Sequence, residues 1–220
     1  MRIGVIGAGH IGGNCARQAV RAGHEVRLSF ARDSSKLESL ASELGERASA
    51  GSVPEAVSFG DAVILAVPWD VIPVALDQAG DLSGKVVIDT TNQFGDGPRP
   101  GPGQTAAEFN KQRMPGARYV KSFNTLTAGF QERAASRRGN ERVVQWICGD
   151  DPEAKKLVAG LIEEMGYVPV DLGSTQTCQV MEAPRRPGAV YGEEYRAADA
   201  PAVVDAVAAG KGIPPTPRYE

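Results

Sequence analysis

Histidine and cysteine are scarce in this chain of 220 residues. The two histidines, His10 and His24, are too few for a histidine-rich metal site, so we expect no bound metal. The three cysteines, Cys15, Cys148 and Cys178, are odd in number and widely spaced, and they show neither a disulfide framework nor metal-ligand spacing. We therefore expect reduced thiols in a cytoplasmic protein.

The sequence also lacks an excess of basic charge and a long apolar run. Its net charge is −3, which leaves no positive field to attract nucleic acid or an anionic membrane. The longest apolar stretch, 62–69, is far shorter than the roughly 20 residues needed to cross a bilayer, and the N-terminus does not resemble a signal peptide. We expect a small-molecule partner, and neither nucleic acid nor a membrane.

A glycine-rich turn, GAGHIG at 7–12, follows a short apolar run near the start of the chain. In a dinucleotide site, Gly7 permits the tight turn, Gly9 lets the backbone approach a pyrophosphate, and Gly12 removes the side chain where the helix crosses the strand. The helix N-terminus adds free N–H groups and a partial positive charge. Since a second apolar strand follows at 25–29, the context predicts a dinucleotide site rather than an ordinary strand–turn–helix.

Short apolar runs alternate with helix-like segments through the first 170 residues, which predicts an α/β fold with a doubly wound, mostly parallel Rossmann-type sheet. We expect strands at 3–6, 25–29, 62–67, 85–89, 118–123, 143–148 and 168–172. We expect helices at 14–20, 34–44, 52–57, 70–79, 105–113, 152–165 and 200–209. Pro169 lacks an amide donor, so the last strand is expected at an edge of the sheet.

The segment 94–104 interrupts this alternation, because glycine and proline occupy most of its positions. It cannot form regular structure. Its place after a sheet strand predicts an active-site loop rather than a domain linker.

The end of the second strand indicates which dinucleotide is bound. An NAD-selective site usually has an acidic residue there, whereas this chain has Ser29 at the strand end and Arg32 and Lys36 close by. Arg32, with the hydroxyls of Ser29 and Ser34, could bind a 2′-phosphate. The alternative is a solvated helix start with Ser34 as its N-cap and with Asp33 lowering the positive charge. We expect NADP rather than NAD.

Several motifs occur in order along the chain. They are the glycine turn, Ser29 with Arg32, AVPW at 66–69, DTTN at 89–92, VKSFNT at 120–125 and CGDDPEAK at 148–155. Over about residues 1–182 this series resembles the NADPH-dependent reductases typified by the coenzyme F420:NADP oxidoreductases. The same domain is similar to the cytoplasmic reductase part of the STEAP metalloreductases. The V-K-x-F-N-T and G-D-D stretches are more specific than the glycine turn.

The resemblance implies a hydride exchanged between the nicotinamide and a flavin-like ring stacked against it, either F420 or a flavin. It places 67–69 beside the cofactor ribose and pyrophosphate, and Asn92 at the nicotinamide half. Asn124, Thr125 and Leu126 would lie against the nicotinamide or the acceptor ring. These segments all follow predicted strands, and ligands in open α/β sheets lie beyond the carboxyl ends of strands.

No residue is assigned a certain catalytic role. Hydride transfer needs no protein nucleophile, because the cofactor carries the chemistry. His10 could approach a phosphate or the acceptor, or it could be an exposed loop residue. Trp69 could instead be a core aromatic, and Asn124 could cap a turn. Tyr191 and Tyr195 could close the pocket, or they could anchor the tail by packing.

These observations combine into one functional hypothesis, an NADPH-dependent oxidoreductase. The expected cofactor-binding residues are Gly7, Gly9, His10, Ile11, Gly12, Ser29, Arg32, Ser34, Lys36, Val67, Pro68, Trp69, Asn92 and Asn124. One alternative keeps NADPH but reduces a small imine or carbonyl intermediate, and another is a non-catalytic NADP-sensing module. We expect a Rossmann-type NADP-binding domain over 1–172. A C-terminal extension over 173–220, helical and extended, would contribute to the acceptor pocket, to a homodimer contact or to both.

Overall fold

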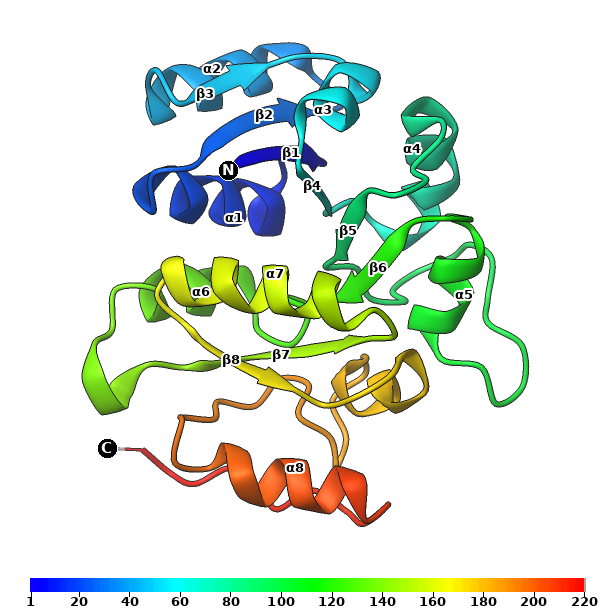
Figure 1. Cartoon of the computed structure of the whole chain (residues 1–220), viewed down its shortest axis with the longest axis vertical. Helices are drawn as coiled ribbons and strands as arrows, with labels where there is room; N and C mark the ends of the chain where they lie inside the picture. Colours follow the sequence, from blue (N-terminus) through cyan, green and yellow to red (C-terminus); the bar gives the residue numbers. More distant parts are fainter. Residues whose placement is uncertain (220) are drawn as a thin grey trace.

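A sheet of eight strands forms the centre of the structure, a computed structural model that describes residues 1–219 (Figure 1). The strands are Arg2–Ile6 (β1), Glu25–Ser29 (β2), Ala48–Ala50 (β3), Ala62–Leu65 (β4), Val86–Asp89 (β5), Arg118–Lys121 (β6), Val144–Gly149 (β7) and Val168–Asp171 (β8). The α-helices are His10–Arg21 (α1), Ser34–Leu44 (α2), Val53–Phe59 (α3), Ile72–Ala79 (α4), Ala106–Gln112 (α5), Ala128–Ala134 (α6), Pro152–Glu164 (α7) and Ala200–Ala208 (α8). Short 3₁₀ helices are Trp69–Val71 (η1), Gly139–Glu141 (η2) and Thr175–Met181 (η3).

The order of the strands in the sheet is β3-β2-β1-β4-β5-β6-β7-β8. Strands β1 to β6 run parallel, β7 is antiparallel to β6, and β8 is parallel to β7. This confirms the predicted doubly wound, mostly parallel Rossmann-type fold. Since β1 lies between β2 and β4, the direction of winding reverses there, and ligands in open α/β sheets bind beyond the strand ends at such a reversal. The glycine turn begins at this point.

Helices cover both faces of the sheet, and each face has its own apolar core (Figure 1). Helices α1, α2, α6 and α7 pack on one face, over strand residues that include Val5 and Ile64. Helices α3, α4, α5 and α8 pack on the other face, over Ile6 and Leu65. Strands β4 and β5 are buried along their whole length, because a parallel strand covered on both faces has no solvent side.

Most of the predicted elements are present, with ends that differ by a few residues. β2 and α2 have the predicted bounds, and β8 is an edge strand as Pro169 indicated. The helix expected at 70–79 is wrong at its start, because η1 precedes α4 and Pro73 lies in the first turn of α4. β3, α6 and η3 were not predicted from the sequence.

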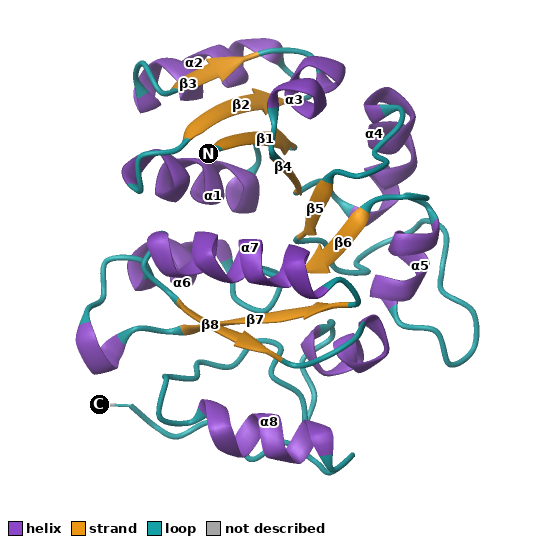
Figure 2. Ribbon diagram, in the orientation of Figure 1, coloured by secondary structure: helices purple, strands orange, loops and turns teal. Residues whose placement is uncertain are grey.

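The C-terminal segment after β8 consists mostly of loops, apart from η3 and α8 (Figure 2). Tyr195 anchors this segment to β7: its ring lies 5.5 Å from that of Trp146, and its carbonyl accepts a hydrogen bond from Val144 N at 2.8 Å. The Tyr195 hydroxyl donates to the carbonyl of Pro214 at 2.9 Å. For Tyr195, the structure therefore shows packing of the tail.

The cysteines and the helices give two further findings. Cys15, Cys148 and Cys178 are all buried and free. Burial raises the pKa of Cys15 to about 12 and that of Cys178 well above its ordinary value, so these two thiols stay protonated and act as small apolar groups.

Among residues 1–219, no helix combines the length and the apolar character needed to span a bilayer.

Candidate cofactor and acceptor site

The glycine turn has the geometry expected for a pyrophosphate site. Gly7 has a φ of +102°, and a Cβ there would lie 2.5 Å from the carbonyl oxygen of Ala66. A Cβ on Gly12 would lie 1.9 Å from the carbonyl oxygen of Gly7, so α1 can cross β1 only without a side chain at this position. A Cβ on Gly9, in contrast, would meet no atom within 4 Å. Gly9 therefore faces open space, which a closely approaching ligand could occupy.

The N-terminus of α1 points into this turn without a protein cap. Gly9 is the N-cap, it has no capping side chain, and the first turn carries no acidic residue. The first helical hydrogen bond runs from Gly13 N to the Gly9 carbonyl at 2.7 Å, so the amides of His10, Ile11 and Gly12 precede the helical ladder. Such amides, together with the helix dipole, bind anions. His10 is exposed at the mouth of the turn.

 A cavity of about 530 Å³ lies beyond the end of β2, and its lining includes Phe30, Arg32 and Pro54. A separate cavity of about 690 Å³ lies between α5 and η3. Arg32, Ser34 and Lys36 are exposed at the β2 cavity or next to it, and in the described part of the chain neither cation forms an ion pair. An apolar slot beside free cations suits an adenosine with a 2′-phosphate.

Two expectations for this segment need correction. Ser29 is fully buried and donates its hydroxyl hydrogen to the Val5 carbonyl at 2.9 Å, so its side chain faces β1 instead of the solvent. The Ser29 carbonyl accepts the amide of Gly7 at 2.9 Å, which ties β2 to the glycine turn. The N-cap of α2 is Asp33 and not Ser34, because the Asp33 carboxylate accepts the amide of Ser35 at 3.0 Å.

On the other side of the turn, Asn92 and Asn124 lie together beyond the ends of β5 and β6. Asn92 Nδ2 donates to the Asn124 carbonyl at 2.8 Å, and Asn124 Nδ2 donates to Asn92 Oδ1 at 3.2 Å. Thr125 and Leu126, which follow Asn124, are both buried. Asn124 Oδ1 and Thr125 Oγ1 have no hydrogen-bond partner among residues 1–219. Buried polar atoms are normally satisfied, so these two acceptors indicate a polar ligand or ordered water.

Two aromatic residues at strand ends have unusual backbone conformations. Phe30 follows β2 with a φ of +60°, and Phe123, just before Asn124, has a φ of +58°. A left-handed conformation is costly for a bulky residue, and it occurs most often near functional sites. Both residues lie at the edge of the sheet where β1 ends in the glycine turn.

A buried ion pair, which the sequence did not predict, supports this edge. Asp89 and Lys121 are both fully buried, and Lys121 Nζ lies 3.4 Å from Asp89 Oδ2. Lys121 also donates to the Thr91 carbonyl at 2.9 Å, and Tyr119 and Asn110 donate to Asp89 at 2.6 and 2.8 Å. The sequence does contain a signal for this ion pair. Asp89 and Lys121 carry opposite charges, and each is the last residue of an apolar strand; the two strands are neighbours in the sheet.

The surroundings keep both members of this pair charged. Burial opposes a charge on Asp89, but Lys121 and the hydrogen bonds from Asn110, Tyr119 and the Thr91 amide outweigh it and lower the pKa of Asp89. Burial also opposes the charge on Lys121, yet Asp89 and the other acidic groups nearby, Glu182 foremost, together outweigh it and raise the pKa of Lys121. The pair therefore fixes the chain that leads to Asn92.

Trp69 belongs to the core. Its side chain is 1% exposed, and its ring is stacked on that of Phe109 with centroids 6.0 Å apart. Its Nε1 donates to the Pro98 carbonyl at 2.8 Å, so it holds the loop 94–104 in place. Of the neighbouring residues expected to line the cofactor, Val67 is buried and Pro68 is exposed.

The C-terminal extension docks on the two asparagines through its main chain. Asn124 Nδ2 donates to the Met181 carbonyl at 2.7 Å, and the Ala183 amide donates to Asn92 Oδ1 at 3.2 Å. The Gly192 amide donates to the Thr125 carbonyl at 2.8 Å. These contacts bring the segment 181–192 beside the residues expected at the nicotinamide and the acceptor.

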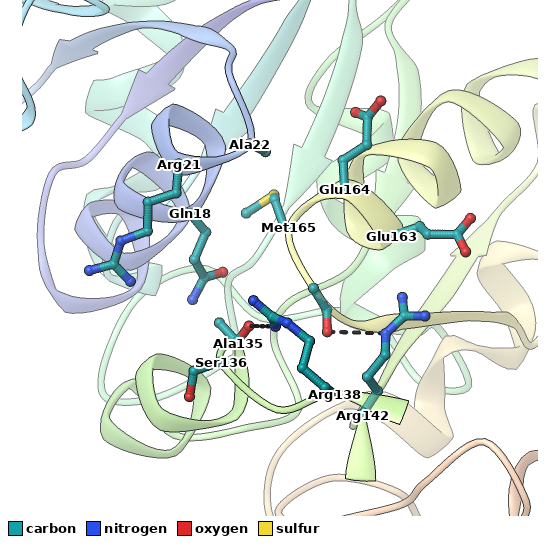
Figure 3. Close-up of a pocket in the computed structure, with 11 residues that line it drawn as sticks. Gln18, Arg21, Ala22, Ala135, Ser136, Arg138, Arg142, Glu163, Glu164 and Met165 are labelled. Atoms are coloured by element: carbon teal, nitrogen blue, oxygen red, sulfur yellow. Dashed lines mark hydrogen bonds between the residues drawn. The ribbon is translucent and has the colours of Figure 1, made fainter. Parts of the chain in front are cut away.

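A separate cavity of about 450 Å³ lies where the C-terminal ends of α1, α6 and α7 meet (Figure 3). Its arginines satisfy main-chain carbonyls there: Arg138 donates to Ala135 at 3.3 Å, and Arg142 donates to Gly166 at 3.4 Å (Figure 3). Helix α1 starts at the glycine turn and ends at this cavity, which is about 18 Å away for 12 residues. The cavity is therefore distinct from the candidate site.

Comparison with known proteins shows the family. A family model described as "NADP oxidoreductase coenzyme F420-dependent" matches residues 2–93. Metalloreductase STEAP3 from Rattus norvegicus is 30% identical over 182 residues, which are 83% of this chain and 36% of that protein. The hypothetical protein SMa0349 from Sinorhizobium meliloti has a solved structure with a TM-score of 0.78 and 30% identity, covering 89% of this chain and 95% of that chain. This chain belongs to the family of F420-dependent NADP oxidoreductases.

A further solved structure agrees with this assignment at the level of the fold. A candidate F420-dependent NADP reductase from Arthrobacter sp. fb24 has a TM-score of 0.71 and 22% identity, and 100% of each chain is covered. The chain spans about a third of the length of the curated relative STEAP3. The family model covers β1 through Asn92, so it includes every residue expected to bind the cofactor except Asn124. Asn124, Thr125 and Leu126, which are expected on the acceptor side, lie outside the residues that the family model matches.

Proposed function

We propose that this oxidoreductase binds NADPH along the edge of the sheet and passes its hydride to a flavin-like ring, either F420 or a flavin. One observation carries the proposal. The uncapped N-terminus of α1, the exposed Arg32 and the Asn92–Asn124 pair all follow the carboxyl ends of neighbouring parallel strands. Across the sheet, from β2 through β1 to β5 and β6, they form a line of cation-bearing, anion-binding and amide groups. This matches the order of 2′-phosphate, pyrophosphate and nicotinamide in NADPH.

Each part of the line has a separate task. The amides of His10, Ile11 and Gly12 would hold the pyrophosphate, and the space at Gly9 admits it. Arg32 and Lys36, with the Ser34 hydroxyl, would neutralise the 2′-phosphate, while Ser29 is left out because its side chain is buried. These cationic contacts distinguish NADPH from NADH.

At the nicotinamide half, polar groups would orient the ring. Asn124 Oδ1 and Thr125 Oγ1, which have no partner in the described part of the chain, would accept hydrogen bonds from the carboxamide N–H₂. The segment 181–192 covers this side and would exclude water from the reacting atoms. NADPH, when bound, supplies a hydride with its electron pair, and the reduced acceptor takes one proton from solvent. No protein nucleophile is needed.

An acceptor screen tests this proposal. NADPH binding is measured by fluorescence titration, and NADPH oxidation is then followed with F420, FMN, a cyclic imine and a small ketone in separate assays. We expect binding, with oxidation by F420 or FMN. Oxidation only by the imine or the ketone would favour a biosynthetic reductase. Binding without turnover on any acceptor would favour an NADP sensor, and absence of NADPH binding would overturn the proposed site.

The division of the chain is part of the same proposal. Residues 1–172 would form the NADP-binding domain, and 173–220 would form an extension that covers the acceptor. Its contacts with Asn92, Asn124 and Thr125 support an acceptor role for the described part of the extension. The homodimer and the cytoplasmic location stay predictions. Light scattering on purified protein tests the homodimer.

A further inference from the structure

Phe94 stands out among the large apolar side chains because 57% of it is exposed. It begins the loop 94–104, and its amide donates to the Asn92 carbonyl at 2.8 Å. This hydrogen bond fixes the residue close to the Asn92–Asn124 pair. An exposed phenylalanine by itself needs no explanation, so its surroundings decide what it means.

The ring of Tyr191, from the C-terminal extension, lies beside Phe94. The two ring centroids are 6.3 Å apart and the planes are tilted by 57°, which is an ordinary aromatic contact. Tyr191 is held on both sides, because Val190 is fully buried and the Gly192 amide donates to the Thr125 carbonyl. Two segments distant in sequence thus bring their rings together beside Asn92 and Thr125.

This pair differs from the other aromatic pairs in residues 1–219. Each of those, such as Trp146 with Tyr195, contains at least one ring buried to 2% exposure or less. Phe94 is exposed and Tyr191 is only half-buried, so this pair presents ring faces to solvent. Within the described chain, the Tyr191 hydroxyl makes no hydrogen bond, and burial raises its pKa, so it remains a protonated donor at neutral pH.

Two arginines lie near the pair, and Arg99 donates to the Gly95 carbonyl at 3.4 Å without an ion pair among the described residues. Arg185 lies against Gly192, and its Nε is 2.6 Å from the Glu193 carboxylate. The surface beside the rings therefore offers aromatic area and a hydroxyl donor. It suits a flat, conjugated ring with polar edges.

We propose that Phe94 and Tyr191 form the binding surface for the hydride acceptor and select a planar conjugated ring. The inference rests on the proposed function, because it identifies the acceptor side of the same site. Stacking on one of the two rings would hold the acceptor beside the Asn92–Asn124 pair, with the ring edge near Thr125. Recognition depends on the ring, so loss of either aromatic ring weakens the binding of riboflavin and of FMN alike.

The test measures acceptor binding directly, with the protein loaded with NADP⁺. Riboflavin and FMN are titrated, and quenching of their fluorescence gives the Kd. Phe94→Leu and Tyr191→Leu remove a ring but keep an apolar side chain, whereas Tyr191→Phe keeps the ring. Phe59→Leu is the control, because the Phe59 ring packs against Arg2 and Arg27 away from the site.

We expect each leucine variant at positions 94 and 191 to raise the Kd for both flavins about tenfold, which is about 1.4 kcal/mol at 25 °C. Tyr191→Phe should stay within about threefold of wild type, and Phe59→Leu should not change the Kd. The KM for flavin in NADPH oxidation should rise in parallel, with kcat little changed. The affinity for NADPH should be unaffected in all four variants.

Several results would overturn the inference. These are an unchanged Kd in both leucine variants, no binding of either flavin to the wild type, or loss of a dimer in Phe94→Leu with flavin affinity intact. The last result would make the pair a contact between subunits. If NADPH fails to bind while the flavins still bind through the two rings, the proposed function fails and the acceptor surface stands.

Discussion

Asn92 and Asn124 are hydrogen-bonded to each other through two contacts, of 2.8 and 3.2 Å, across the ends of β5 and β6. The same side chains reach the C-terminal extension, since Asn124 Nδ2 donates to Met181 and Asn92 Oδ1 accepts from Ala183. One pair of amides thus joins the sheet edge to the segment that covers it. Damage to the pair should loosen the extension before it disturbs the sheet.

Asn124→Ala tests this relationship. The variant leaves the Met181 carbonyl without the Asn124 donor and removes one of the two donors to Asn92 Oδ1, which should lower the free energy of unfolding by about 1–3 kcal/mol. Trypsin should then cleave faster after Arg185, which follows the docked segment. Urea unfolding and timed proteolysis measure the two effects. Asn140→Ala, an exposed position in η2, is the control, and equal behaviour of the two variants would contradict the prediction.

Gly9→Ala and Gly12→Ala separate ligand binding from folding. A Cβ at position 9 meets no protein atom within 4 Å, so Gly9→Ala should lose no more than about 1 kcal/mol of stability while NADPH affinity falls about tenfold or more. A Cβ at position 12 would lie 1.9 Å from the Gly7 carbonyl, and we expect a loss of about 1–3 kcal/mol or more. Thermal unfolding with and without NADPH measures both. A Gly9→Ala variant that binds NADPH normally would remove the pyrophosphate from this turn.

Arg32→Ala should change the choice between NADPH and NADH. Hydrogen bonds to a charged group contribute about 1.5–3 kcal/mol, so NADPH affinity should fall about 10- to 100-fold, with NADH affinity unchanged. Arg47→Ala is a matched control, because Arg47 lies near the start of β2, where its carbonyl accepts the amide of Val26. Calorimetric titration of both nucleotides gives the ratio. If the ratio is the same in wild type and Arg32→Ala, the 2′-phosphate lies elsewhere.

Lys121→Met should be strongly destabilising. It leaves the carboxylate of Asp89 buried without its counter-charge, which costs about 3–5 kcal/mol. The double variant Asp89→Asn, Lys121→Met removes both charges and should recover much of this loss. Chemical unfolding of the wild type, the single variant and the double variant measures the coupling. A double variant no more stable than Lys121→Met would show that the hydrogen bonds matter more than the charges.

The same pair predicts the pH dependence of stability. Burial opposes the charge on Asp89, but Lys121 and the hydrogen bonds to the carboxylate together outweigh it and lower the folded pKa. The contribution of Asp89 therefore exists above the unfolded pKa of about 3.9 and is lost as the pH falls further. The folded pKa of Lys121 is raised, so its contribution exists below about 10.4 and is lost as the pH rises further. Urea unfolding from about pH 3 to about pH 11 should show both losses. They should be smaller in the double variant.

The sequence predicted those parts of the fold whose signal is local. The spacing of Leu37 and Leu40 gave α2, and the apolar run of β4 gave a buried strand, because both patterns follow from burial of one helix face or of a whole strand. β3 was missed because three small residues carry no strand signal. α6 was missed because seven residues hold too few apolar positions to show a helical period.

In the candidate site, the glycine turn could be derived from the sequence, whereas side-chain direction could not. Ser29 and Trp69 stand at the expected places in the chain, but their side chains point into the protein, and only the packed structure decides this. The contact between Phe94 and Tyr191 depends on how the extension folds back over the sheet. No spacing along the chain encodes it.

The extension meets the sheet through main-chain atoms: the carbonyl of Met181 and the amides of Ala183 and Gly192. Main-chain groups are the same for nearly every amino acid, so the junction does not specify which side chains the segment carries. Substitutions between these anchor points can therefore alter the surface offered to an acceptor while the nucleotide half stays intact. For protein engineering, this makes 184–191 a natural region in which to vary acceptor preference, with Asn92 and Asn124 kept fixed.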